Sequence, residues 1–140
     1  MGSLTGIRPK SVFQVAGAGS VGTGSIRGMP FLRTLREAGF AVWPFDAPRG
    51  GEPLLLEIWP RLCYVEPLVK SSADGRAAWL ARHAPSLAPA HRTAAERSDD
   101  AFDALASALA LWQARDTLAL LPPARDEREQ LEGRIWVPPA

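Results

Sequence analysis

The strongest structural signal in the chain lies in residues 98–114, SDDAFDALASALALWQA. Ser98 is a favoured N-cap residue, and good helix formers follow it with no glycine or proline among them. We therefore expect a helix from Asp99 to about Ala114. At 3.6 residues per turn, one face of this helix is apolar. That face consists of Phe102, Leu105, Leu109 and Trp112.

Three carboxylates lie beside this apolar face near the start of the helix, on Asp99, Asp100 and Asp103. The helix dipole stabilises the first two by about 0.3–1 kcal/mol each, so they need no ligand to explain them. Asp103 lies a turn further along, where Asp99 at i,i+4 and Asp100 at i,i+3 repel it. Mg²⁺ or Mn²⁺ would relieve this repulsion, because both prefer hard oxygen ligands. The spacing therefore indicates a candidate metal site, beside the simpler interpretation of a stabilised helix N-terminus.

Short apolar runs alternate with helical patterns in the rest of the chain. We expect strands at residues 11–16 (SVFQVA), 40–45 (FAVWPF), 54–59 (LLLEIW) and 134–137 (RIWV). Expected helices begin at Pro30 and end before Gly39, span about residues 73–83 after a cap at Ser71 or Ser72, and begin near His91. This alternation predicts an α/β fold with a central sheet. The strands are few for a complete sheet.

Glu57 is an anomaly within the apolar run at residues 54–59. A carboxylate in such a strand is costly unless it is paired or coordinated. It is therefore a candidate fourth acid for the proposed metal site. A salt bridge with Arg61 or Lys70 is the structural alternative.

A glycine-rich segment matches the GxGxxG pattern of dinucleotide-binding loops at Gly17, Gly19 and Gly22. An apolar run precedes it, a helix follows, and Asp46 ends the next expected strand. In a Rossmann unit the helix begins within the motif, yet glycines and Pro30 would then fall in its first turns, where they disfavour helix. Two other interpretations stay open. One is a packed or flexible loop, and the other is a loop that supplies polar contacts to a different chemistry.

The composition indicates an ordinary globular protein. The chain has 140 residues, 46% hydrophobic and 22% charged, with a net charge of +1. We expect residues 1–10 to be disordered and residues 11–140 to form a single domain. No run approaches the ~18 apolar residues of a membrane span, so we expect a soluble, cytoplasmic protein. Zinc-binding and nucleophile-elbow motifs are missing, which argues against those hydrolase classes.

The acidic helix also carries a family resemblance. Residues 100–106, DAFDALA, resemble the last catalytic helix of the ribonuclease-H-like superfamily, especially the DxxDAxA helix of RuvC-type Holliday-junction resolvases. Six segments in order resemble the domain of unknown function 429 family, a bacterial family of predicted nucleases of that fold. They are SVFQVAGAGSVGTGSIRGMP, AVWPFD, LLLEIWP, Val69-Lys70, SDDAFDALASALA and EGRIWVP.

The resemblance implies a fold and a chemistry. The fold is the C-terminal part of a three-layer α/β/α ribonuclease-H-like domain. The chemistry is two-metal hydrolysis of phosphodiesters, which makes nucleic acid the implied partner. On this basis Asp100 and Asp103 look like metal ligands, Asp99 like an auxiliary acid and Glu57 like a supporting acid. The glycine-rich loop would approach a phosphate through its backbone N–H groups.

The chain departs from the family pattern at its start. Family members begin with a strand that carries an aspartate, whereas the first acidic residue here is Glu37. We therefore expect a domain that lacks the N-terminal strands. The resemblance is compatible both with an active nuclease and with an inactive remnant of one. An unpaired edge on the strand at residues 54–59 would favour a homo-oligomer. A nucleotide-binding module and a non-catalytic interaction domain are the alternative functions.

Overall fold

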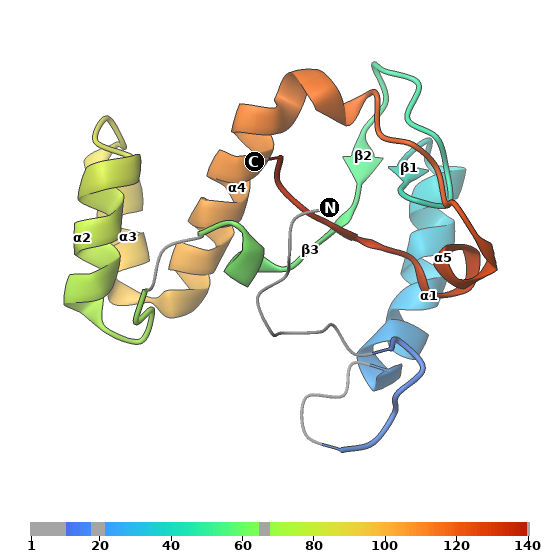
Figure 1. Ribbon diagram of the computed structural model, residues 1–140, viewed down its shortest axis with the longest axis horizontal. Helices are drawn as coiled ribbons and strands as arrows, with labels where there is room; N and C mark the ends of the chain where they lie inside the picture. Colours follow the sequence, from blue (N-terminus) through green and yellow to red (C-terminus); the bar gives the residue numbers. More distant parts are fainter. Residues whose placement is uncertain (1–10, 18–21, 65–67, 140) are drawn as a thin grey trace. The chain divides into compact units, whose positions relative to one another are not determined.

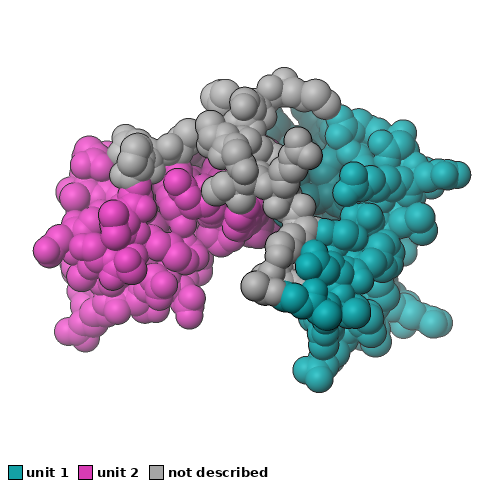
Figure 2. Space-filling model, turned by 60° about the horizontal axis from the view of Figure 1, so that its bottom comes forward, with its two compact units in different colours: residues 1–57, 117–135, 140 teal, residues 58–116, 136–139 magenta. Residues whose placement is uncertain are grey.

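The computed structural model describes residues 11–17, 22–64 and 68–139. The expectation of disorder at residues 1–10 lies outside these ranges. The described chain combines helices with short strands and is broadly α/β (Figure 1). It divides into two compact units (Figure 2). Unit 1 comprises residues 1–57, 117–135 and 140, and unit 2 comprises residues 58–116 and 136–139.

Unit 1 contains a small parallel sheet beside a long helix. Helix α1 (Gly22–Glu37) leads into β1 (Ala41–Val42), which pairs in parallel with β2 (Leu54–Leu55). Helix α5 (Glu127–Glu132) also belongs to this unit. Strands β3 (Glu57–Ile58) and β4 (Ile135–Trp136) form a second two-stranded sheet, and the boundary between the units passes through both strands.

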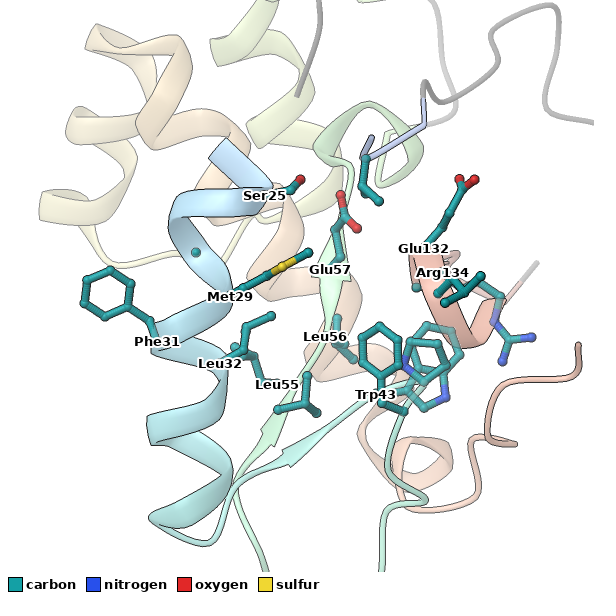
Figure 3. A pocket seen from close by; sticks show the side chains of 17 residues that line it. Ser25, Met29, Phe31, Leu32, Trp43, Leu55, Leu56, Glu57, Glu132 and Arg134 are labelled. Carbon is teal, nitrogen blue, oxygen red and sulfur yellow. The ribbon is translucent and has the colours of Figure 1, made fainter. Parts of the chain in front are cut away.

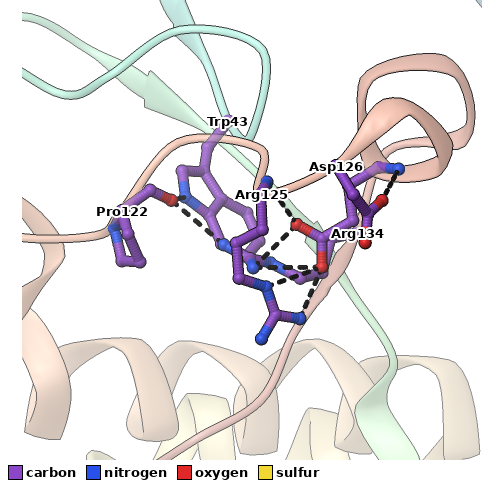
Figure 4. A network of polar contacts seen from close by, with 6 residues as sticks. Trp43, Pro122, Arg125, Asp126 and Arg134 are labelled. Carbon is purple, nitrogen blue, oxygen red and sulfur yellow. Dashed lines mark hydrogen bonds and ion pairs between the residues drawn. The ribbon is translucent and has the colours of Figure 1, made fainter.

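Buried residues around β1 form the core of unit 1. Ala41, Val42 and Trp43 are each less than a tenth exposed. The indole N–H of Trp43 donates to the carbonyl of Pro122 at 2.8 Å, and the Arg134 guanidinium stacks over the Trp43 ring (Figure 4). These contacts attach the C-terminal segment of the unit to β1.

Unit 2 is a helical unit. It contains the short 3-10 helix η1 (Pro60–Leu62), α2 (Ala73–His83), α3 (Pro89–Arg97) and most of α4 (Asp99–Leu118). Helices α2 and α3 lie side by side (Figure 1). Its core consists of Tyr64, Trp79, Leu80, Ala84, Ala95, Phe102 and Ala106.

The helices of unit 2 confirm the sequence-based predictions closely. Helix α2 has the predicted bounds, and the Ser72 side chain caps it by accepting from the Gly75 backbone N–H. Helix α3 begins two residues before His91. Helix α4 begins at Asp99 as expected and continues to Leu118. Capping residues and regular apolar spacing therefore located these elements well.

The predictions were less accurate for unit 1. The strand expected at residues 11–16 is wrong, because the described segment forms turns instead. The expected helix start at Pro30 is also wrong, because α1 begins at Gly22 and contains Pro30. The strand at residues 54–59 is confirmed but is interrupted at Leu56. That at residues 40–45 is reduced to two residues, since a turn begins at Trp43.

The predicted apolar face of α4 needs a correction. Trp112 is 67% exposed, whereas Ala106, Ala110 and Ala114 are buried in line with Phe102. The buried residues at this spacing of four after Phe102 are all alanines. The larger apolar residues at Leu105 and Leu109 are only half-buried.

Candidate functional site

The position of Asp103 follows from how α4 is anchored. The Ser98 hydroxyl caps the helix by accepting from the Ala101 backbone N–H at 3.3 Å. Phe102 is fully buried, and its ring lies 5.6 Å from that of Tyr64 and 5.2 Å from that of Trp79, measured between ring centres. These ring contacts set the rotation of α4 about its own axis. They turn Asp103 toward Tyr64 and away from bulk water.

Asp103 is the centre of a polar cluster, here called the Asp103 cluster, formed by Tyr64, Lys70, Asp99 and Asp103. The Lys70 ammonium donates to Asp103 Oδ2 at 2.6 Å and lies 3.9 Å from Asp99 Oδ2. The Tyr64 hydroxyl lies 3.3 Å from Asp103 Oδ1 and donates to it. Both oxygens of Asp103 therefore have partners, and one cation lies within ion-pair distance of two carboxylates.

The electrostatics of the cluster favour a positively charged Lys70 and a protonated Tyr64. The hydrogen bond with Asp103 raises the pKa of the Lys70 ammonium above its ordinary value. Burial raises the pKa of the Tyr64 phenol, and the negative charge of Asp103 raises it further. At neutral pH Lys70 is therefore positively charged and Tyr64 keeps its proton as a hydrogen-bond donor.

A buried arginine holds the segment that carries Lys70. The Arg76 guanidinium on α2 donates to the Lys70 carbonyl and to the carbonyls of Ala95 and Glu96 at the end of α3. Gly75 lies so close to the same segment that an added Cβ would come within 2.9 Å of the Val69 carbonyl oxygen. The backbone of Lys70 is thus fixed against α2 and α3.

A cavity of about 250 Å³ opens beside Asp103. Its charged lining consists of Arg61, Lys70 and Asp103. The Arg61 guanidinium carbon lies 5.2 Å from the centre of the Tyr64 ring, and this side chain also donates to the Tyr64 carbonyl. Two cations next to a carboxylate suit a ligand that is itself anionic, such as a phosphate group.

The carboxylates of the Asp103 cluster are few for a metal site made of protein ligands alone. Within residues 11–17, 22–64 and 68–139, no group of three or more His, Cys, Asp or Glu residues is arranged to hold a metal ion. Mg²⁺, however, is commonly bound through one or two carboxylates, with water and substrate phosphate as further ligands. Asp99 and Asp103 converge on one cation, so the residues present fit an open site of this two-carboxylate kind.

The other two acids predicted for the site, Asp100 and Glu57, are not members of the Asp103 cluster. Asp100 is exposed, and the Lys70 contacts are made by Asp99 and Asp103. Glu57 is the last residue of unit 1, and its role as a fourth acid stays a prediction. The structural alternative, a salt bridge of Glu57 with Arg61 or Lys70, also stays a prediction, because both cations belong to unit 2. Within unit 2, Lys70 pairs with Asp103 and the Arg61 guanidinium donates to the Tyr64 carbonyl.

The glycine-rich loop is only partly described. Gly19 lies outside the described residues. Gly22 begins α1, donates to the Gln14 carbonyl at 3.0 Å and leaves no room for a Cβ, which would come within 2.7 Å of that oxygen. Gly17 has a positive φ of 96°. Since residues 11–17 form turns, the strand that precedes the loop in a Rossmann unit is missing from the described segment.

Sequence reasoning missed Tyr64 and the pairing of Lys70 with Asp103. Thirty-three positions separate Lys70 from Asp103, and no local pattern links them. The one available signal was the mutual repulsion expected among the aspartates. It indicates that a cation lies nearby but does not identify which residue or ion supplies the charge.

No helix in the described part of the chain is long and apolar enough to cross a membrane. Comparison with family models, with curated proteins and with solved structures finds no match.

Proposed function

We propose that unit 2 carries a nuclease-like site that binds phosphodiesters of nucleic acid and hydrolyses them with a divalent cation, Mg²⁺ or Mn²⁺. The Asp103 cluster is the centre of this site. The resemblance of residues 100–106 to the last catalytic helix of ribonuclease-H-like domains supports the proposal, because these residues lie on the helix that carries Asp103.

The observation that carries the proposal is the Lys70 ammonium within reach of two carboxylates, at 2.6 Å from Asp103 and 3.9 Å from Asp99. An ammonium in this position marks where a cation is favoured. A bound divalent cation would supply Lewis-acid activation of water and stabilise the negative charge of the leaving oxygen.

The protein's own residues have separate tasks in this proposal. Asp99 and Asp103 hold the cation, and the Tyr64 hydroxyl orients Asp103 through its hydrogen bond to Oδ1. Lys70 and Arg61 line the cavity and attract the phosphate, because charge-assisted hydrogen bonds to anions are stronger than neutral ones. Asp100, exposed on the same first turn, is available as a further ligand.

The first test measures melting temperature with and without Mg²⁺ or Mn²⁺. At a concentration 100-fold above its dissociation constant, a bound ion stabilises the folded state by about 2.7 kcal/mol. We expect this stabilisation in the wild type and its loss in Asp103→Asn. The matched control is Asp116→Asn, a change of the same type on an exposed aspartate of the same helix. An Asp103→Asn protein that responds to metal like the wild type would rule out the site.

Replacing the lysine provides a second, opposite readout. Lys70→Met leaves Asp99 and Asp103 without their cation, so we expect lower stability in the absence of metal. Metal should then restore stability and bind more tightly than to the wild type, because it no longer competes with the ammonium. If metal leaves the melting temperature of Lys70→Met unchanged, Lys70 is a structural partner only.

Hydrolysis is tested with labelled single-stranded and duplex DNA and RNA. We expect metal-dependent cleavage that Asp103→Asn abolishes and Asp116→Asn retains. Metal binding without cleavage of any of these substrates would support the metal site and contradict the proposed activity.

A further inference from the structure

A second cavity, of about 500 Å³, lies entirely within unit 1. Its walls come from α1, from the strands β1 to β3 and from the chain around α5 and β4 (Figure 3). Met29 and Leu32 of α1 point toward Leu55, Leu56 and the Trp43 ring across this space (Figure 3). Cavities of 300–1,000 Å³ with mainly apolar walls are typical of small-molecule sites.

Helix α1, which forms one wall of this cavity, leaves much of its apolar surface exposed. Among its residues only Gly22 is buried, while Ile26, Met29 and Phe31 are 57%, 47% and 71% exposed. A helix of 16 residues is held in place chiefly by the apolar face it buries. Apolar surface of this extent beside a cavity therefore favours an occupant with an apolar body.

The charges at the cavity decide what else the occupant carries. Glu132 at the rim pairs with Arg128 at 3.6 Å, and Arg134 pairs with Glu129 at 2.9 Å. The Glu57 side chain is exposed, has no ion pair or hydrogen bond with the described residues of unit 1, and lies at the end of the cavity near Ser25 (Figure 3). Partial desolvation by the surrounding chain raises the pKa of the Glu57 carboxyl, although the residue as a whole is exposed.

We infer that this cavity binds a small organic cation, with an aromatic or aliphatic body between α1 and the β1–β2 sheet and an ammonium or amidinium group on Glu57. The body is held by the apolar walls. The charge is held by Glu57, the one acid of the cavity lining that has no ion pair with the described residues of unit 1. The lining of this cavity shares no residue with the cavity beside Asp103, and the inference does not rest on the proposed function.

The test compares three probes of the same shape and different charge. They are 1-naphthylmethylamine, 1-naphthylmethanol and 1-naphthoate, each titrated into the full chain and followed by ligand-observed NMR and calorimetry. Near neutral pH we expect the amine to bind about fivefold more tightly than the alcohol, because the pair with Glu57 is charge-assisted. The carboxylate should bind least. Lowering the pH below 4.5 protonates Glu57 and should remove the preference for the amine.

Two variants separate the charge from the apolar walls. Glu57→Gln should make the amine and the alcohol bind equally, with the alcohol unchanged. Met29→Trp should weaken all three probes by filling the cavity, and Met29 is exposed enough for the variant to fold. The control is Glu37→Gln, also on α1 but outside the cavity lining.

Three results would overturn the inference. They are no binding of any probe at millimolar concentration, equal binding of the three by the wild type, and a preference for the amine that survives in Glu57→Gln. Self-association that blocks the probes and disappears in Met29→Trp would assign the cavity to a second copy of the chain instead.

Discussion

Glu129 shows how one side chain can organise a unit. Its carboxylate receives hydrogen bonds from the Arg125 guanidinium and backbone N–H and from Arg134 (Figure 4). The hydrogen bonds from Arg125 are the largest cause that lowers the pKa of Glu129, to about 2. Arg134 in turn covers the Trp43 ring, with its guanidinium carbon 4.4 Å from the ring centre. The network therefore links α5 to the core of unit 1.

A pH-dependent loss of stability follows at this residue. Because the folded pKa of Glu129 is depressed, its contribution is complete above the unfolded value of 4.5 and is lost as the pH falls toward 2. Glu129→Gln should lower the free energy of unfolding by about 1–2 kcal/mol at neutral pH, since the hydrogen bonds are charge-assisted. Urea unfolding at neutral and acidic pH measures this.

The difference between wild type and Glu129→Gln should shrink between pH 4.5 and pH 2. Glu127→Gln is the control, because Glu127 is exposed in the same helix. A difference that stays constant over this pH range would show that the network does not depend on the charge of Glu129.

At the scale of elements, two glycines on helices have opposite roles. Gly75 in α2 lies against the Val69 carbonyl, and its backbone N–H donates to the Ser72 cap. Gly24 in α1 has open space around the position of a Cβ. The first glycine is required by close approach, whereas the second only costs helix stability.

Alanine substitutions should therefore have effects of opposite sign. Gly75→Ala should lower stability and weaken the Lys70–Asp103 pair, because the Cβ must displace the segment that carries Lys70. Gly24→Ala should raise the free energy of unfolding by about 0.5–1 kcal/mol, the usual helical preference for alanine over glycine. Thermal unfolding of both variants measures the change. Equal effects of the two would contradict the packing of Gly75.

At the scale of the whole molecule, each unit has its own buried residues. The core of unit 2 is built around Phe102 and Trp79, whereas Trp43 and its neighbours form the core of unit 1. The sequence-based expectation of a single domain for residues 11–140 stays a prediction. Whether the two units unfold together is a measurable property of the chain.

Hydrogen exchange on two variants tests this cooperativity. Phe102→Leu removes ring contacts worth about 0.5–1.5 kcal/mol each, and we expect it to lower protection in α2, α3 and α4. Glu129→Gln should lower protection around α5 and β1 instead. If both variants reduce protection equally in the two units, the chain unfolds as one cooperative domain.

The sequence by itself determined the local elements whose signals are short-range. The caps at Ser72 and Ser98 and the uninterrupted helix formers after Asp99 predicted α2 and α4 to within a few residues, because capping and helix formation involve neighbours along the chain. The alternation of helices and strands likewise predicted a broadly α/β chain. The acidic cluster and its need for a cation were also visible in the spacing of Asp99 and Asp103.

Only the tertiary structure showed which cation lies beside Asp99 and Asp103. Lys70 reaches Asp103 because Arg76 and Gly75 fix its backbone against α2 and α3, and such a contact leaves no trace in local spacing. Burial decided the face of α4 as well, with Ala106 inward and Trp112 outward, because tertiary contacts and not apolar spacing alone determine which apolar side chains of a helix leave water. The start of α1 at Gly22 followed from the contact of that glycine with Gln14, against its intrinsic preference.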